Sequence, residues 1–572
     1  MQSKKILCWL LSIVCLLSAM SSLFVVANAD DKGYSWAGSW STSPIKTGVT
    51  LNGVRLCDFL TNSSYRTVVQ CTLGGEKVRL KFSNRYGDAA VTINETNIAR
   101  TSTLDDASII EGSVLPVTFG GAATITIPAG KEIYSDPINM KVSALEKISI
   151  TSYIKSFTYI TTAGFYGGTS YVESGNKLTE IAYNKAAPLL FSSGAITYHT
   201  IPFLCNLDVY AKDAYSIVII GDSTVTNQAP YYLAEKLVKS GVNNVGVLQQ
   251  AIVANRLLYS GEGVSIVGNI YGDSCLNRFE ADALKQAGVK KIFVKIGVND
   301  VIHPRCNSMK GIAPLATTEE IIDGYKALIS RAHEAGLEIY FFSRTAWRGY
   351  SRNFALTKSD VPDVVWSQDA EDILLACNNW LKSSFSGVDG YIDLDSMRDP
   401  YDERQLLPAY TTDGAHFSDL GARILVDLIP LRYIGISESK NVSIVKLYED
   451  GKGGEQVTTP FTPIKSQPVT QKPDTPASSN TPTTKPEAPT NAPTIINVPT
   501  VLVTAPKPDT TKAPSAPNAE NISKVVNELV KPEPLAELDT RTKVGVAILT
   551  MLSVAMLAVV AVYFVNKRRL SD

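Results

Sequence analysis

Five short apolar runs, separated by helical patterns, lie between residues 213 and 436 of this chain. The first, Ser216-Ile217-Val218-Ile219-Ile220, is continuously apolar after its serine, as in a parallel strand covered on both faces. The other four begin near residues 244, 291, 339 and 391. Helical periods lie between them, over residues 319–335 and 370–381 among others. Strands that alternate with helices predict an open parallel α/β sheet.

Residues from about 34 to 212 follow a different pattern, in which apolar and polar residues alternate. Two such runs cover residues 65–70 and 77–82, and Gly74-Gly75 between them predicts a hairpin turn. Further short strands are expected over residues 90–93, 123–127 and 148–153. The spacing of these strands favours a β-sandwich or jelly roll.

Both ends of the chain carry membrane-targeting signals. Two lysines and an apolar run precede Ala27-Asn28-Ala29, which predicts a secretory signal peptide over residues 1–29. Residues 544–565 are uncharged and, at about 1.5 Å per residue, long enough for a transmembrane helix. The tail, residues 566–572, is basic, and positive side chains stay on the cytoplasmic side. We therefore expect a single-pass cell-membrane protein whose larger part is extracellular.

The segment before this helix has the composition of a linker. Residues 456–518 are rich in Pro, Thr, Ala and Lys, so they are predicted to form an extended stalk without a core. The folded part lies upstream, and we divide it into a β-sandwich domain, residues 30–212, and an α/β domain, residues 213–440.

Charge and cysteine content exclude some classes of protein. The chain has 54 basic and 55 acidic residues, so it lacks the basic excess expected of a nucleic-acid-binding protein. Six cysteines remain after the signal peptide, an even number that permits disulfides in an oxidising compartment. None forms a Cys-x-x-Cys pair, and the sequence indicates no metal and no cofactor. No feature indicates the oligomeric state.

Gly221-Asp222-Ser223 directly follows the first apolar run of the α/β region, and a helical stretch near residues 231–237 follows it. A serine at the carboxyl end of the first parallel strand lies where α/β sheets bind ligands. The tripeptide alone is a weak signal, because a second copy, Gly272-Asp273-Ser274, occurs in the same chain. That copy follows a polar stretch rather than a buried strand, and we interpret it as a loop.

A serine nucleophile needs a base, and the chain has four histidines. His416 lies in Asp413-Gly414-Ala415-His416, where two intervening residues let the carboxylate fold back onto the imidazole. Asp300-Val301-Ile302-His303 has the same spacing. However, Asp300 belongs to Gly297-Val298-Asn299-Asp300, which either forms a turn at a strand end or aims the Asn299 amide at an oxyanion. We favour His416 as base, interpret His333 as a packing residue and give His199 no role.

These motifs together resemble the SGNH hydrolase superfamily, the GDSL lipases and esterases. Gly221-Asp222-Ser223 is similar to its first block, Gly297-Val298-Asn299-Asp300 to its third and Asp413-Gly414-Ala415-His416 to its last, in the same order. Trp40-Ser41-Thr42-Ser43-Pro44 and Ser83-Asn84-Arg85-Tyr86-Gly87 look like the N-terminal β domain of secreted two-domain members.

The resemblance covers about residues 35 to 436 and implies a flavodoxin-like hydrolase domain. It implies Ser223 as nucleophile, His416 as base and Asp413 as the acid that orients the base. It also implies an oxyanion hole formed by the Ser223 backbone N–H, the Asn299 amide and a backbone N–H from the second block.

The second block departs from the family pattern. The family usually has a glycine there, whereas Gln249-Gln250-Ala251-Ile252-Val253-Ala254-Asn255-Arg256 places Ala254 at that position. Alanine keeps the N–H, so we expect the oxyanion hole to survive if the φ of Ala254 is negative.

The resemblance favours an extracellular serine esterase that hydrolyses short acyl esters, with acetyl groups on carbohydrate as the favoured substrates. One alternative is a non-catalytic carbohydrate-binding or adhesion protein with the same fold, and another is a lipase that acts on longer acyl chains. Trp36 and Trp40 could stack on a sugar, although burial in the β-sandwich is favoured.

Overall fold

The computed structural model describes residues 33–449, except residues 52–53, 103–106, 184–186, 194–195, 227, 264–267, 351–363 and 365. The predicted signal peptide, stalk, transmembrane helix and tail therefore lie outside the described residues. Among the residues that are described, no helix is both long and apolar enough to cross a membrane. All of them belong to one compact unit, Met1–Pro468.

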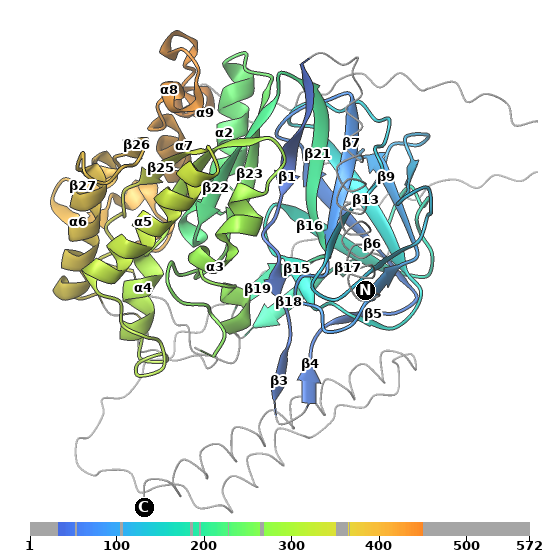
Figure 1. Cartoon of the computed structure of the whole chain (residues 1–572), viewed down its shortest axis with the longest axis horizontal. Coiled ribbons are helices and arrows are strands. Elements are labelled where there is room, and N and C mark those ends of the chain that lie inside the picture. Colours follow the sequence, from blue (N-terminus) through green and yellow to red (C-terminus); the bar gives the residue numbers. More distant parts are fainter. Residues whose placement is uncertain are drawn as a thin grey trace, which may run out of the picture. The chain divides into compact units, whose positions relative to one another are not determined.

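A five-stranded sheet forms the middle of the C-terminal half (Figure 1). Its strands lie in the order β23 (Val245–Ala251), β22 (Tyr215–Gly221), β24 (Val289–Lys295), β25 (Glu338–Phe342) and β26 (Gly390–Ile392). Every neighbouring pair is parallel, which confirms the predicted parallel sheet. In chain order the arrangement is 2-1-3-4-5, the doubly wound order of flavodoxin-like sheets.

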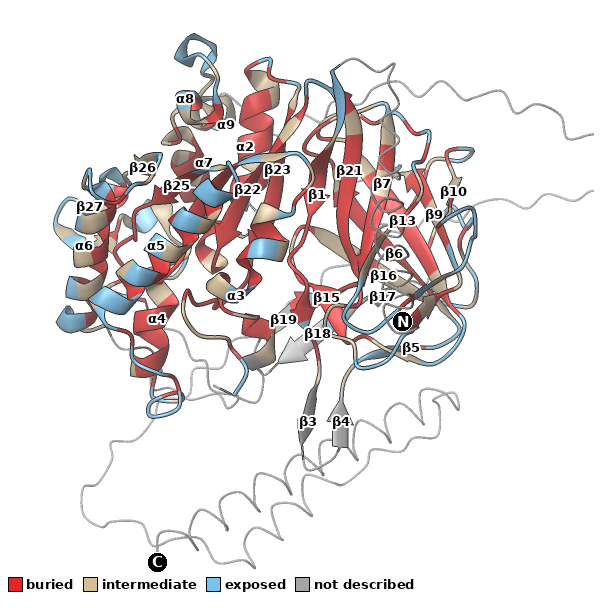
Figure 2. Ribbon diagram, viewed as in Figure 1, coloured by how far each residue is buried: buried red, intermediate tan, exposed pale blue. Residues whose placement is uncertain are grey.

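Helices cover both faces of this sheet. They are α2 (Gln228–Lys239), α3 (Cys275–Phe279), α4 (Val298–Ile302), α5 (Thr318–Glu334), α6 (Gln368–Lys382), α7 (Asp419–Asp427), α8 (Leu431–Ile434) and α9 (Ile444–Glu449). Side chains of β22 alternate between the two faces: Ile217 belongs to the same core as Leu233 of α2, whereas Val218 belongs to the core that contains Tyr325 of α5. Figure 2 shows buried strands between helices whose outer surfaces are exposed, as the continuous apolar runs predicted.

Capping hydrogen bonds define the starts of two of these helices. The Thr317 hydroxyl accepts from the Glu320 N–H at 3.2 Å, and the Glu320 carboxylate accepts from the Thr317 N–H at 2.8 Å. This reciprocal capping box starts α5. Ser418 caps α7 by accepting from the Gly421 N–H at 3.1 Å.

Two larger antiparallel sheets form the core of the N-terminal region, and its other strands pair in smaller sheets. One contains β1 (Tyr34–Ser41), β21 (Leu204–Lys212), β7 (Lys77–Ser83) and β12 (Glu132–Tyr134). The other contains β10 (Leu115–Val117), β9 (Glu95–Arg100), β13 (Lys147–Ile154), β6 (Ser63–Gln70), β16 (Gly168–Ser174) and β17 (Ala187–Pro188). Val78 and Leu207 of the first sheet share one core with Ile148 and Val69 of the second. The antiparallel β region predicted from the alternating pattern is therefore present.

The remaining strands are short. They are β2 (Ile45–Lys46), β3 (Val49–Leu51), β4 (Val54–Leu56), β5 (Phe59–Leu60), β8 (Val91–Ile93), β11 (Ile125–Ile127), β14 (Thr158–Tyr159), β15 (Thr162–Gly164), β18 (Leu190–Ser193), β19 (Ile196–His199), β20 (Ile201–Pro202), β27 (Arg398–Asp399) and β28 (Asp402–Leu406).

The hairpin predicted at Gly74-Gly75 is wrong. Strands β6 and β7 are both present, but they belong to different sheets and do not pair. The two glycines instead allow a close backbone approach to Val142, whose carbonyl oxygen would lie 2.8 Å from a Cβ at Gly74 and accepts from the Gly75 N–H at 2.9 Å. A glycine pair at a crossing between sheets thus has the same sequence signature as a hairpin turn.

The β region covers the outer edge of the parallel sheet. The Thr72 hydroxyl donates to the Val247 carbonyl at 3.0 Å and accepts from the Val247 N–H at 2.9 Å, and the Ser41 hydroxyl donates to Gln249. At Gly246 a Cβ would lie 2.0 Å from the Gly38 carbonyl oxygen, so β1 and β23 are in close backbone contact. These contacts satisfy the edge of β23, which an open sheet otherwise leaves exposed.

The compact fold continues past residue 440. Helix α9 packs against α7, and Ile444 is fully buried. Asp427 accepts from the Ser443 hydroxyl at 2.6 Å and from the Ile444 N–H at 3.0 Å. The boundary that we placed at residue 440 therefore lies before a packed helix. The sequence pattern did not reveal α9, because this helix is too short to give a strong periodic signal.

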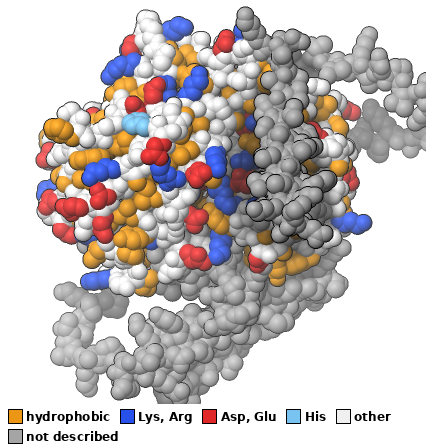
Figure 3. Space-filling model, viewed as in Figure 1, with side chains coloured by type: hydrophobic (Ala, Val, Ile, Leu, Met, Phe, Trp, Pro, Cys, Tyr) orange, Lys and Arg blue, Asp and Glu red, His pale blue; other side chains and the backbone are white. Residues whose placement is uncertain are grey.

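On the face shown in Figure 3, basic and acidic side chains are interspersed. The six cysteines of the described region form no disulfide; they are Cys57, Cys71, Cys205, Cys275, Cys306 and Cys377. Within the same region, no group of three or more His, Cys, Asp or Glu side chains is placed to hold a metal ion.

Candidate active site

Ser223 begins the turn that follows β22. A Cβ at Gly221 would lie 2.1 Å from the Lys295 carbonyl oxygen on the neighbouring strand β24, so only glycine fits there. The Asp222 carboxylate accepts from the N–H and hydroxyl of Thr224 at 3.0 and 2.7 Å. The strand end and this cap together place Ser223 in the crevice between β22 and β24. The strand order reverses at this crevice, and doubly wound sheets bind their ligands there.

His416 lies on the loop before α7. Its Nε2 lies 2.8 Å from the Ser223 Oγ, and its Nδ1 lies 2.7 Å from the Asp413 Oδ2. The N–H groups of Ala415 and His416 donate to the other oxygen of Asp413, at 3.1 and 2.9 Å. The Thr411 hydroxyl donates to the His416 carbonyl at 2.8 Å. The loop therefore holds Asp413 and His416 in one geometry, and the three side chains that the sequence analysis selected lie in hydrogen-bonding contact.

The hydrogen bonds of the loop keep Asp413 ionised beside His416. Burial acts to raise the pKa of Asp413, but the hydrogen bond and charge of His416 and two backbone N–H donors lower it to about 2. An ionised Asp413 favours the His416 tautomer that carries its proton on Nδ1, which leaves Nε2 to accept from Ser223. The Tyr350 ring packs edge-on against the imidazole, with centroids 5.6 Å apart and planes at 71°.

The predicted oxyanion donors lie on one side of Ser223. Ala254 and Asn299 line a small cavity together with Ser223 and His416. The Asn299 amide donates to the Asn255 carbonyl at 3.0 Å, which leaves its second N–H for a ligand. Among the described residues, neither the Ser223 N–H nor the Ala254 N–H donates to a protein acceptor.

The negative φ that we expected Ala254 to need is not adopted. Ala254 has a φ of +55°, in the left-handed region that glycine normally occupies. The loop around it is clamped: the Asn255 amide donates to the carbonyls of Tyr271 and Asp273 at 2.7 and 2.8 Å. The Asp300 carboxylate accepts from two further backbone N–H groups just beyond. The chain thus keeps a backbone conformation typical of glycine while it carries an alanine, so a negative φ was the wrong condition for an N–H donor at this position.

Asp300 and His303 do not form a second acid–base pair at the serine. Asp300 accepts from the N–H groups of Leu257 and Leu258 at 2.7 and 3.0 Å, so it supports the second block. His303 is fully buried, and burial together with nearby Arg256 lowers its pKa to about 3. Neither residue lines a cavity at Ser223.

The second Gly-Asp-Ser copy has structural contacts, in agreement with its interpretation as a loop. Ser274 is buried and caps α3, accepting from the Asn277 N–H at 3.2 Å, while Asp273 accepts from the Tyr86 hydroxyl at 2.9 Å. His333 is not a packing residue. It lies near the exposed end of α5, with its Nε2 3.0 Å from the Asp389 Oδ2. The interpretation failed because the amphipathic pattern does not show which side of the last helical turn faces solvent.

Arg278 is the residue that the sequence analysis missed. It is buried on α3 and donates to the Gly221 carbonyl at 3.0 Å, to the Gln250 carbonyl at 2.6 Å and to the Asn255 Oδ1 at 3.1 and 3.0 Å. It also contacts the Ser43 hydroxyl of the β region at 3.2 Å. One guanidinium therefore links β22, the strand before Ser223, to the second block. The sequence contained one signal for Arg278, because Ser274 of the second Gly-Asp-Ser copy caps α3, the helix that carries this arginine.

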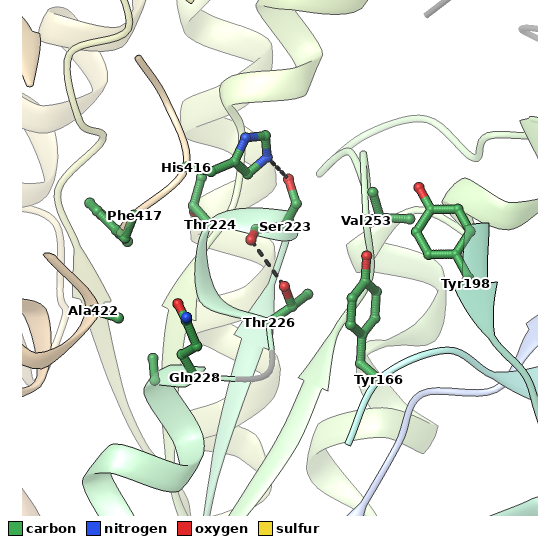
Figure 4. A pocket seen from close by; sticks show the side chains of 11 residues that line it. Tyr166, Tyr198, Ser223, Thr224, Thr226, Gln228, Val253, His416, Phe417 and Ala422 are labelled. Carbon is green, nitrogen blue, oxygen red and sulfur yellow. Dashed lines mark hydrogen bonds between the residues drawn. The ribbon is translucent and has the colours of Figure 1, made fainter. Parts of the chain in front are cut away.

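Ser223 lines two cavities formed by the described residues. The smaller, of about 20 Å³, lies on the side of the predicted oxyanion donors, and its apolar wall includes Val253, Ile302 and Trp347. The larger, of about 270 Å³, is lined by residues of both halves of the chain, and Figure 4 shows Ser223 and His416 at its rim.

No protein-family model matches the chain, and no curated protein matches it. Solved structures do show similarity. An acetyl xylan esterase is 16% identical with a TM-score of 0.27, over 39% of this chain and 100% of the other. A mutant acetyl-xylooligosaccharide esterase from Geobacillus Stearmophilus is 14% identical with a TM-score of 0.29, over 39% and 95%. A GDSL-like lipase from Bacteroides thetaiotaomicron is 13% identical with a TM-score of 0.25, over 38% and 88%.

Proposed function

We propose that this chain is a serine esterase of the SGNH type that hydrolyses short acyl esters through an acyl-enzyme. The observation that carries the proposal is the continuous hydrogen-bonded path from the Ser223 Oγ through both nitrogens of His416 to the Asp413 carboxylate. This is the arrangement by which a base removes a serine proton and an acid stabilises the resulting imidazolium.

The proposed reaction uses each of these groups in turn. His416 Nε2 takes the proton of the Ser223 hydroxyl as Oγ attacks the ester carbonyl carbon. The oxyanion is stabilised by the backbone N–H groups of Ser223 and Ala254 and by the Asn299 amide. His416 then gives its proton to the leaving alcohol oxygen, which breaks the ester bond. Water attacks the acyl-enzyme by the same steps and releases the acid and free Ser223.

The small cavity favours acetyl esters. It offers about 20 Å³, and about 10–15 Å³ is needed to hold one water molecule. A methyl group fits this space, whereas a longer acyl chain would have to displace Ile302 or Trp347, both buried. This size argues against the lipase alternative, provided that the acyl group lies beside the oxyanion donors.

The proposed location is the outside of the cell membrane, with the esterase held on a stalk. This part of the proposal rests on the signal peptide, residues 1–29, and on the apolar segment 544–565 with its basic tail.

The test is hydrolysis of an aryl acetate by the purified full-length chain. Ser223→Ala and His416→Ala should each lower kcat by roughly 10⁴-fold or more, and the double variant should lose little more, because the two side chains act as a unit. Ser274→Ala and His303→Ala are the matched controls and should retain most activity. An essential His303 with a dispensable His416 would refute the assignment of the base. A folded but inert parent would favour the carbohydrate-binding alternative.

A further inference from the structure

The larger cavity at Ser223 has one wall from each half of the chain. Tyr166 lies in the turn between β15 and β16, and Tyr198 lies in β19, so both come from the N-terminal β region. Figure 4 shows these two rings across the cavity from Phe417 and Ala422 of the α/β region. The β region therefore contributes directly to the surroundings of the proposed nucleophile.

The tyrosine rings are held by other aromatic side chains. The ring of Phe165 stacks on Tyr198, with centroids 5.2 Å apart and planes at 4°. Tyr166 packs edge-on against Tyr198, with centroids 6.2 Å apart and planes at 73°. Both arrangements are favourable for aromatic rings, and together they make a preformed wall.

The turn that carries Tyr166 is fixed from both halves of the chain. The next residue, Gly167, has a φ of +95°, and its carbonyl accepts from the Trp40 Nε1 at 2.5 Å and from the Tyr231 hydroxyl at 2.7 Å. Trp40 belongs to β1 and Tyr231 to α2. Trp40 is 1% exposed, so this tryptophan positions the tyrosine wall and has no free face for a sugar.

The floor of the cavity is polar. Gln228 is exposed, and Figure 4 shows its amide between the two walls. The Thr226 hydroxyl also lines the cavity, and it donates to the Ser223 carbonyl at 3.1 Å. An amide offers both donors and an acceptor, and hydroxyls offer both roles. Aromatic side chains beside such groups suit a ligand with an apolar face and several hydroxyls.

We infer that the larger cavity binds the alcohol half of the ester, and that Tyr166 and Tyr198 select a sugar-like cyclic polyol there. This rests on the proposed function, because an acyl group in the small cavity leaves the larger one to the leaving alcohol beside the His416 Nε2. A volume of about 270 Å³ is near the lower end, about 300 Å³, of small-molecule pockets. The cavity thus fits one ring rather than a longer chain.

The experiment compares three esters on the full-length chain: a monoacetylated methyl glucoside, ethyl acetate and methyl hexanoate. We expect Tyr166→Ala and Tyr198→Ala each to lower the kcat/KM ratio of glucoside acetate to ethyl acetate about tenfold, as for loss of one aromatic contact. Tyr401→Ala is the matched control, since Tyr401 is 97% exposed and lines neither cavity at Ser223. That variant should keep the ratio of the parent.

Two outcomes would overturn the inference and leave the esterase proposal intact. One is an unchanged ratio in both cavity variants, which would show that the tyrosines do not contact the alcohol. The other is a larger loss for methyl hexanoate than for the glucoside acetate, which would show that the cavity takes the acyl chain.

A parent that hydrolyses none of the three esters would instead overturn the proposed function. In that case NMR titration of the Ser223→Ala chain with methyl glucoside tests the inference by binding alone, with no need for ester hydrolysis. Binding that disappears when Tyr166→Ala is added supports a sugar site. Absence of binding, or binding that survives the change, overturns it.

Discussion

Replacing Ala254 by glycine tests two properties of this residue: the strain of its backbone, through stability, and its proposed role as an oxyanion donor, through activity. Ala254 has a φ of +55°, and the left-handed region costs a residue with a Cβ about 1–2 kcal/mol. Glycine removes this strain but adds about 0.4–1 kcal/mol of chain entropy to the unfolded state. The two terms oppose each other, so Ala254→Gly should change the free energy of unfolding by roughly 0 to +1.5 kcal/mol.

A matched alanine isolates the strain. Ala214 is 6% exposed, against 3% for Ala254, and is not among the residues with positive φ. Ala214→Gly carries the same entropic term without any relief of strain. The two variants should therefore differ by about 1–2 kcal/mol in favour of Ala254→Gly. At about 2 cal/mol/K per residue, this corresponds to roughly 1–2 °C in Tm for a unit of about 400 residues.

Activity measured on the same variants tests the oxyanion hole. If the Ala254 N–H already faces the cavity, Ala254→Gly should keep kcat near or above that of the parent. Asn299→Ala should then lower kcat by about 10²–10³, the usual effect of losing one donor. Equal destabilisation in the two glycine variants would refute the strain argument. A gain of about 100-fold in kcat with Ala254→Gly would show that the methyl group displaces the donor in the parent.

Three further predictions concern stability and topology. Burial lowers the pKa of Lys295 to about 7, although the negative charge of Asp222 acts to raise it. In the unfolded chain a lysine has a pKa near 10.4. Between about pH 7 and 10 the unfolded state therefore binds more protons, so the contribution of Lys295 to stability should rise with pH. Lys295→Met should therefore raise Tm most below pH 7 and least near pH 10, and a difference independent of pH would contradict this. A fragment of residues 30–449 should have a higher Tm than a fragment of residues 30–440. The shorter fragment lacks the buried Ile444 side chain, whose burial contributes about 2 kcal/mol to the free energy of unfolding. Equal Tm values would contradict the packing of α9. Protease added to intact cells should release the folded part by cutting within residues 456–518, and release only after membrane disruption would argue against an external domain.

Local sequence patterns predicted the strand before Ser223 and the contact between Asp413 and His416. The apolar run before Ser223 and the spacing of Asp413 and His416 each depend on neighbours a few residues away. Such signals can be read without the fold, because the strand, loop or helix that they specify is itself local. The parallel order of the sheet followed from the alternation of strands and helices.

The predictions that failed depend on long-range contacts. Gly74-Gly75 was assigned to a hairpin, since its pairing with Val142 is not visible in sequence. The positive φ of Ala254 follows from a loop clamped by Asp300, more than forty residues away. Tyr166 and Tyr198 carry no motif, and only the packing of the β region beside α2 brings them to Ser223.

Arg278 explains how distant motifs form one site. Its guanidinium contacts the carbonyl of Gly221, 57 residues away, and the side chain of Asn255, 23 residues away. Asn255 in turn accepts from Asn299, 44 residues further along the chain. Because these bonds are buried, truncating Arg278 would leave several acceptors unsatisfied at about 1–3 kcal/mol each. The blocks of the site therefore depend on a side chain outside all of them, and a motif search that finds the blocks leaves this residue unidentified.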